Sequence, residues 1–257
     1  MVEAFAVASG KGGTGKTTAT LAVGMALAAD HDVTVVDADT GMANLLFHAD
    51  LEDAAVTLHD LLISDRDVRV ADAVYERFGL RVVPCGTDLS GFEAANPERL
   101  RAVIAELAAD TDVLLLDSPA TLESRSAVLP IVLADRMLLI TQPTVPALSD
   151  GLKVQEYATS YGTDVAGVIF NKVHDSDRVD RVTGMASEYL AGPILGTVPD
   201  DESARAARRA GEPLLSHAPE SSAASAFRAA VADLTVRPGA PEGVADRFRN
   251  AVVPEDP

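Results

Sequence analysis

The sequence predicts an α/β fold, a mostly parallel β-sheet with helices on both faces. Short apolar segments rich in β-branched residues alternate with helical patterns along the chain, which is typical of parallel strands joined by crossover helices. The apolar segments have few polar interruptions, as expected for strands that are covered on both faces. A chain of 257 residues is long enough to bury a core of this kind.

The predicted elements follow each other in a regular order. Strand patterns occupy residues 2–8, 33–36, 80–83, 113–116, 137–140 and 165–170, and residues 194–196 predict a last short strand. Helical patterns occupy residues 16–29, 97–109, 124–134, 149–160 and 178–190, and an alanine-rich closing helix is expected at residues 221–234. Ligands of such sheets bind beyond the carboxyl ends of the strands, so we expect functional residues there.

One domain is expected over residues 1–234, followed by a linker and a short C-terminal tail over residues 235–257. The linker is rich in proline and glycine. Residues 243–253 predict a weak amphipathic helix with three apolar side chains on one face. Two alternatives stay open for the tail: it is disordered or docked on the core, or it makes a weak contact with a membrane.

The net charge is −18, from 39 acidic and 21 basic residues, and it predicts a halophilic host. Such a surface repels itself in dilute buffer, and salt relieves the repulsion by shortening the Debye length. The amino terminus shows no basic leader, so a cytoplasmic protein is expected. The charge argues against broad affinity for nucleic acid or anionic lipid.

A single Cys85 excludes an all-cysteine zinc or iron–sulfur site within one chain, and the scattered histidines predict no metal site.

A glycine-rich segment between the first strand and the first helix has the phosphate-loop pattern. Its glycines allow backbone N–H groups to turn inward around phosphates, and the following helix adds the positive end of its dipole. Lys16 is expected to contact the β and γ phosphates, and the Thr17 hydroxyl to bind Mg²⁺. The nucleotide-binding residues predicted in this segment are Gly10, Lys11, Gly12, Gly13, Thr14, Gly15, Lys16, Thr17 and Thr18.

An additional lysine, Lys11, occupies a loop position that the general pattern leaves free. With it, residues 10–17 resemble the loop of the MinD/ParA family, the deviant Walker A P-loop ATPases. The resemblance implies ATP and Mg²⁺ as cofactors and an ATP-sandwich homodimer in which Lys11 reaches the nucleotide of the partner subunit. A cation supplied from outside would stabilise the transferring phosphoryl group, as an arginine finger does. The alternative is a solvated surface lysine, in a chain with only four lysines.

Three aspartates end two predicted strands. Asp37 and Asp39 follow the second strand and would point to the same face if that strand continued, and Asp117 ends residues 113–116. Carboxylates at this edge can hold Mg²⁺ through water and orient an attacking water.

The resemblance to the family extends to these aspartates. Residues 37–45 resemble its switch I, in which the second aspartate positions the water, and residues 117–120 resemble its Walker B and switch II segments. The expected catalytic residues are therefore Lys11, Lys16 and Asp39, and the expected magnesium site comprises Thr17, Asp37 and Asp117.

Two further segments are predicted to surround the base. Asn171 ends the strand at residues 165–170, where its amide could pair with the adenine edge, although asparagine also commonly forms turns. In the family an asparagine here contacts the base and a later turn closes over it, and Pro199, Asp200 and Asp201 match that turn.

The resemblance implies a MinD-like ATPase that cycles between an ATP-bound dimer and an ADP-bound monomer and positions a cellular structure, such as a division site or a motility or chemosensory apparatus. A protein partner is expected, and a peripheral contact with the membrane or cell pole is one of the two alternatives that stay open for the tail. The main alternative is a ParA-like DNA-segregation ATPase, which needs a basic strip, and only Arg205, Arg208 and Arg209 cluster tightly. An electron-transferring relative would need paired cysteines, and an ATP-binding scaffold would show little turnover.

Overall fold

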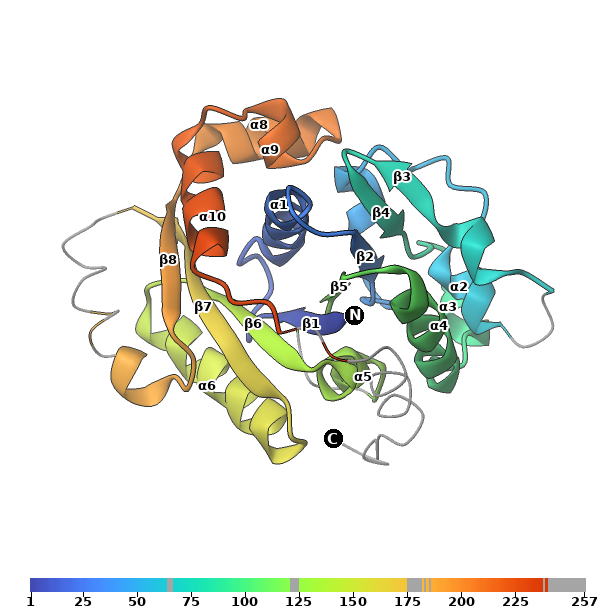
Figure 1. The fold of residues 1–257 in the computed structure, drawn as a ribbon, viewed down its shortest axis with the longest axis horizontal. Coiled ribbons are helices and arrows are strands. Elements are labelled where there is room, and N and C mark those ends of the chain that lie inside the picture. Colours follow the sequence, from blue (N-terminus) through green and yellow to red (C-terminus); the bar gives the residue numbers. More distant parts are fainter. Residues whose placement is uncertain are drawn as a thin grey trace.

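The computed structural model describes residues 1–63, 67–120, 125–174, 182, 184, 186–237 and 239. The described part contains one eight-stranded sheet in the order β3-β4-β2-β5-β1-β6-β7-β8 (Figure 1). All neighbouring strands are parallel except β3 and β4, which are antiparallel. The predicted α/β class with a mostly parallel sheet is confirmed.

The strands agree closely with the apolar patterns. Their bounds are β1 (Glu3–Ala8), β2 (Val33–Asp37), β3 (Tyr75–Arg77), β4 (Leu80–Val83), β5 (Val113–Asp117), β6 (Arg136–Thr141), β7 (Asp164–Val173) and β8 (Ile194–Pro199). The strand β3 was not predicted, because three residues with a mostly exposed pattern carry no apolar signal. It joins β4 through Phe78 and Gly79, which both have positive φ.

The helices cover both faces of the sheet. Their bounds are α1 (Lys16–Leu27), α2 (Leu58–Leu62), α3 (Leu89–Ala94), α4 (Leu100–Leu107), α5 (Arg125–Leu133), α6 (Val145–Ser160), α8 (Glu202–Ala210), α9 (Leu214–His217) and α10 (Ser222–Ala232). Short 3₁₀ turns lie at Leu45–His48, Val70–Ala73, Pro97–Arg99 and Ala108–Asp110. Figure 1 shows α1 and α10 on one face and α5 and α6 on the other. Because both faces are covered, the central strands β1, β2, β5 and β6 are buried throughout.

The predicted helices differ from the observed ones mainly at their ends. The helix predicted from residue 149 begins four residues earlier, since Thr144 accepts a hydrogen bond from Ala147 N and a proline follows in the first turn. Only part of the predicted helix at residues 178–190 is described, and residues 186–189 are helical. The helix α8 was missed, although its Asp201 N-cap and the left-handed Gly211 at its end are sequence signals.

The chain stays attached to the domain beyond residue 234. Gly239 pairs with Val2 through two backbone hydrogen bonds of 2.9 Å, in an antiparallel bridge. The weak amphipathic helix predicted at residues 243–253 lies outside the described residues.

Asp201 joins α8 to α10, and this junction yields a stability prediction. Its Oδ1 accepts a hydrogen bond from Ser203 N (2.8 Å), and its Oδ2 accepts hydrogen bonds from the Ser222 hydroxyl (2.8 Å) and Ala223 N (3.3 Å). These hydrogen bonds lower the pKa of Asp201 to about 2. Because the folded pKa lies below the ordinary value, the carboxylate stabilises the fold above pH about 4 and loses this effect as the pH falls toward about 2.

Replacing Asp201 by alanine is expected to reduce the free energy of unfolding by about 1 kcal/mol at neutral pH, the usual cost of a lost N-cap. Denaturant unfolding at a series of pH values measures this difference, and it should shrink below pH about 4. Asp233→Ala, at an exposed aspartate, is the matched control. A difference that stayed constant down to pH about 2 would contradict the role assigned to the carboxylate.

Candidate nucleotide-binding site

The glycine-rich loop crosses from the end of β1 to the start of α1, and its glycines are required by geometry. Gly13 and Gly15 have φ values of 80° and 86°, in the left-handed region that other residues rarely adopt. A Cβ atom at Gly10 would overlap the backbone of Asp150 in α6. The loop therefore keeps its course only with glycine at these positions.

A cavity of about 520 Å³ opens beside this loop, at the carboxyl ends of the strands. Its wall is formed by the loop, by the segment after β2, by the ends of β7 and β8, and by α8. The predicted residues that line it are Lys11, Gly12, Gly13, Thr14, Gly15, Lys16, Thr17, Thr18, Asp39, Asn171, Pro199 and Asp200. The structure thus brings together residues that are far apart in the sequence.

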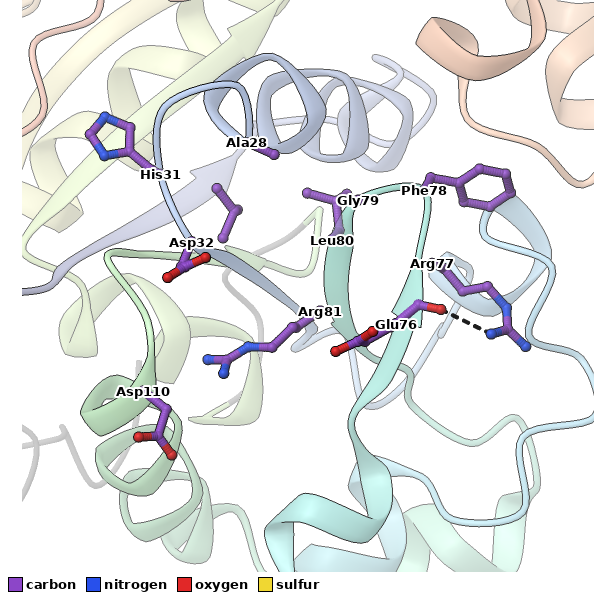
Figure 2. Close-up of a pocket in the computed structure, with 11 residues that line it drawn as sticks. Ala28, His31, Asp32, Glu76, Arg77, Phe78, Gly79, Leu80, Arg81 and Asp110 are labelled. Atoms are coloured by element: carbon purple, nitrogen blue, oxygen red, sulfur yellow. Dashed lines mark hydrogen bonds between the residues drawn. The ribbon is translucent and has the colours of Figure 1, made fainter.

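A second cavity of about 520 Å³ lies at the opposite edge, where β2 and β4 begin (Figure 2). It carries side chains of both charges. Arg77 donates a hydrogen bond to the backbone oxygen of Glu76 (2.9 Å), and Arg81 donates one to the Thr34 hydroxyl (3.0 Å). Since parallel sheets bind ligands at the carboxyl edge, the cavity beside the glycine-rich loop is the candidate site.

Lys16 and Asp117 form a buried ion pair at the base of this cavity. The Lys16 Nζ lies 2.8 Å from Asp117 Oδ1, and the two side chains are 8% and 1% exposed. The Thr20 hydroxyl donates a second hydrogen bond of 3.0 Å to the same oxygen. An ammonium group has three N–H donors, so Lys16 retains donors for phosphate oxygens.

Asp37 is fully buried beside Asp117, its register partner across β2 and β5. It accepts hydrogen bonds from the backbone N–H groups of Asp39 (3.3 Å), Asn44 (3.2 Å) and Leu45 (3.0 Å). Burial and the neighbouring Asp117 raise the pKa of Asp37 to about 8. A cation at this edge would favour the ionised carboxylate again.

The donor set suits Mg²⁺ rather than a softer metal. The Thr17 hydroxyl and the carboxylates of Asp37 and Asp117 are hard oxygen donors. Within the described residues, no three His, Cys, Asp or Glu side chains form a metal-ligand group. Mg²⁺ commonly keeps several waters and binds substrate phosphates, so few protein ligands suffice. The magnesium role of these residues stays a prediction.

Asp39 takes a different direction from Asp37. The strand β2 ends at Asp37, so the alternation that would have placed both side chains on one face does not continue. Asp39 lines the cavity and accepts a hydrogen bond from Met42 N (2.9 Å), and partial burial raises its pKa. The carboxylate is therefore placed where it could orient a water.

His59 supports the segment that carries Asp39, and the sequence does not indicate this role. Its Nε2 lies 3.0 Å from the backbone oxygen of Thr40, and both residues are buried. Because a carbonyl can only accept, Nε2 carries the hydrogen. A lone histidine has no sequence signal for such a contact.

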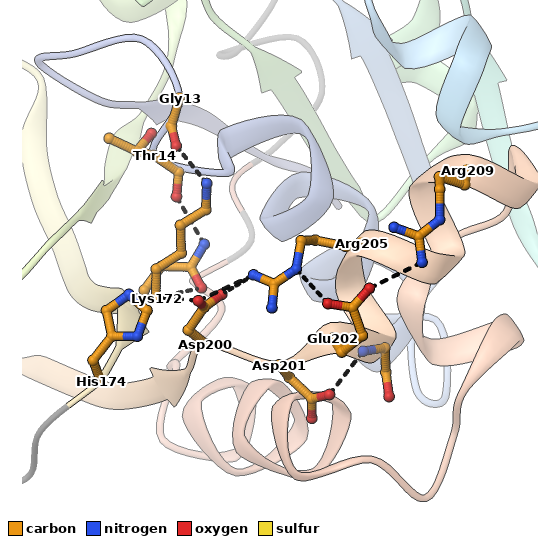
Figure 3. Close-up of polar contacts among 11 residues, drawn as sticks. Gly13, Thr14, Lys172, His174, Asp200, Asp201, Glu202, Arg205 and Arg209 are labelled. Carbon is orange, nitrogen blue, oxygen red and sulfur yellow. Dashed lines mark hydrogen bonds and ion pairs between the residues drawn. The ribbon is translucent and has the colours of Figure 1, made fainter.

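Asn171 and Asp200 both line the cavity, and both have protein partners. Asn171 Nδ2 donates a hydrogen bond to the backbone oxygen of Thr14 (2.8 Å). The Asp200 carboxylate accepts two hydrogen bonds from Arg205 Nη1 (2.8 and 3.0 Å) and lies 3.4 Å from His174 Nε2 (Figure 3). Contact of Asn171, Pro199 and Asp200 with a base stays a prediction.

This geometry agrees with the comparison to known proteins. A family described as the CobQ/CobB/MinD/ParA nucleotide binding domain matches residues 5–214. The chain belongs to this family. As a CobQ/CobB/MinD/ParA domain it is a nucleotide-binding protein, and the loop, Lys16 and the cavity beside them form the part of it that is suited to phosphates.

Individual relatives of this CobQ/CobB/MinD/ParA domain cover most of the chain. An uncharacterized ATP-binding protein of Methanocaldococcus jannaschii is 37% identical over 236 residues, which is 91% of this chain and 88% of that protein. The septum site-determining protein MinD of Pyrococcus horikoshii, solved in complex with Mg-ADP, is 32% identical with a TM-score of 0.81, covering 90% of this chain and 95% of that one. In a MinC:MinD complex of Aquifex aeolicus, the matching chain is 25% identical with a TM-score of 0.74, covering 90% and 94%.

Proposed function

We propose that this protein is a MinD-like ATPase whose ATP-bound dimer and ADP-bound monomer alternate to position a cellular structure. The observation that carries the proposal is Lys11, which lies on the loop and lines the cavity, yet is exposed. Within the described part of the chain, its side chain makes no hydrogen bond or ion pair. The ammonium group of Lys11 is therefore available to the nucleotide of a second copy of the chain, as expected for a site that a dimer completes.

The proposed reaction divides the work among few residues. A water oxygen bonds to the γ-phosphorus while the bond to the β–γ bridging oxygen breaks, which yields ADP and phosphate. Asp39 orients the water, Lys16 balances charge on the β and γ phosphates, and Lys11 of the partner subunit balances the transferring group. Mg²⁺ near Thr17, Asp37 and Asp117 would neutralise further phosphate charge when bound.

Replacing Asp39 by alanine is expected to lower phosphate release by about 10²-fold or more, because the attacking water loses its orienting group. ATP binding survives, so the variant should form a more persistent dimer than the parent protein. Gel filtration with light scattering in molar KCl, with ATP or with ADP, measures the amount of dimer. Asp53→Ala, at an exposed position, is the control. A monomer under every nucleotide would contradict the proposed cycle.

The ParA-like alternative requires free basic side chains. Arg205 is paired with Asp200 and Glu202, at 2.8 and 2.7 Å, and Arg209 is paired with Glu202 at 2.9 Å. Arg208 lines the nucleotide cavity. Two of the three arginines in the predicted cluster are therefore paired with carboxylates, from Asp200 and Glu202, and this disfavours DNA as the partner.

A membrane contact is proposed to occur through residues 243–253 of the tail, which lie outside the described residues. None of the described helices is both long enough and apolar enough to cross a bilayer. We expect the full chain to sediment with anionic vesicles in ATP but not in ADP, and a chain ending at Ala240, which keeps the Val2–Gly239 bridge, to stay in the supernatant. Sedimentation with plasmid DNA in place of vesicles would favour the ParA-like function instead.

A further inference from the structure

The end of β7 holds two consecutive carbonyl groups of the phosphate loop. Lys172 Nζ donates a hydrogen bond to the backbone oxygen of Gly13 (2.7 Å), and Asn171 Nδ2 donates one to the backbone oxygen of Thr14 (2.8 Å). Figure 3 shows Lys172 extended toward Gly13 beside the contact made by Thr14. Neighbouring residues of one strand therefore bind neighbouring residues of the loop.

The backbone of this strand end is arranged for the contact. Lys172 has φ of 56°, a left-handed conformation that is unfavourable for a residue with a side chain. Lys172 N also donates a hydrogen bond to Asn171 Oδ1 (2.9 Å). Because that N–H must bind the oxygen of the amide, Asn171 Nδ2 is directed toward the loop. Unfavourable backbone conformations of this kind cluster at functional sites.

The two contacts determine where the loop N–H groups point. In a planar trans peptide the C=O and the following N–H point in opposite directions. Holding the carbonyls of Gly13 and Thr14 toward β7 therefore turns the N–H groups of Thr14 and Gly15 the other way. Within the described residues neither N–H donates a hydrogen bond, and the buried Thr14 hydroxyl, in a residue 3% exposed, also has no partner. These donors are available to an anion.

We propose that Lys172 is a positioning residue of the nucleotide site: together with Asn171 it holds the loop in the form that binds the phosphates of a nucleoside di- or triphosphate. The ammonium group also polarises the Gly13–Thr14 peptide, which strengthens the Thr14 N–H as a donor. The inference rests on the proposed function, since it assumes that the cavity binds such a nucleotide. Three of the four lysines of the chain, Lys11, Lys16 and Lys172, line this cavity.

The test compares Lys172→Met with Lys153→Met, which removes an exposed lysine on α6. Calorimetry in molar KCl should show that Lys172→Met binds ADP about tenfold or more weakly, because a hydrogen bond from a charged donor is lost, while Lys153→Met binds as the parent does. The affinity for pyrophosphate should fall to the same extent, since Lys172 and Asn171 hold the loop that binds phosphates and do not act on the base. The melting temperature of the nucleotide-free protein should change little.

Several outcomes would overturn the inference. Unchanged ADP affinity in Lys172→Met would do so, as would a loss for ADP but not for pyrophosphate. If ADP affinity fell in dilute buffer but not in molar KCl, Lys172 would act as a distant charge that salt screens, and not through a direct hydrogen bond to the loop. Lys172→Gly relieves the backbone strain and should show the same loss of affinity in a protein at least as stable. If the parent protein failed to bind ADP, the proposed function itself would fail.

Discussion

Replacing Lys11 by alanine is expected to lower ATP turnover by about 10³-fold or more while leaving the affinity for ADP unchanged. The magnitude is that of a cationic finger supplied to a phosphoryl-transfer site. ADP affinity is retained because Lys11 is exposed and has no partner within the described residues, and the loop carbonyls are held by β7. Phosphate release and calorimetry measure the two quantities, and Lys153→Ala is the control.

A mixing experiment distinguishes action within one chain from action across a dimer. Lys11→Ala and Asp39→Ala are each expected to be inactive alone. If Lys11 serves the partner's nucleotide, each mixed dimer has one complete site, with Asp39 from one subunit and Lys11 from the other. An equimolar mixture should then recover about a quarter of the parent rate, since about half of randomly formed dimers are mixed. No recovery would indicate that Lys11 acts on its own nucleotide or does not act at all.

Replacing Arg136 by methionine is expected to lower the free energy of unfolding by about 3–5 kcal/mol, because a buried Glu3 loses its charge partner. Arg136 Nε donates a hydrogen bond to Glu3 Oε1 (2.6 Å), and the two side chains are 10% and 2% exposed. Arg136 Nη2 also donates one to the backbone oxygen of Thr235 (2.5 Å), and the guanidinium carbon lies 5.2 Å from the centre of the Phe5 ring. Denaturant unfolding measures the loss.

The double variant Glu3→Gln/Arg136→Met should recover much of this stability, because no isolated charge is left buried. Arg69→Met, which breaks an exposed ion pair with Asp72, should have no measurable effect. An Arg136→Met protein as stable as the parent would show that Glu3 is adequately stabilised by its other partner, the backbone N–H of Arg237.

Several features of the site can be predicted from the sequence only in part, or not at all. The pair Asp37 and Asp39 was found as a motif, yet β2 ends at Asp37 and sends one carboxylate into the core and the other to the cavity. The hydrogen bond from the Asn171 amide nitrogen to the backbone oxygen of Thr14 has no signal in the sequence, and the contact of Asn171 with a base stays a prediction. Lys172 has no signal in the sequence, because its contact depends on a loop residue 159 positions away.

Features that depend on neighbours along the chain can be predicted from the amino-acid pattern. Apolar runs locate seven of the eight strands in the described part of the chain, and the spacing of glycines and lysines locates the phosphate loop, because both signals lie within a few residues. Distant partners can be seen only in the folded chain: Lys16 meets Asp117, Lys172 meets Gly13, and Arg136 meets Glu3, at separations of 101, 159 and 133 residues. Such contacts arise from the order of strands in the sheet, and local periodicity carries no information about that order.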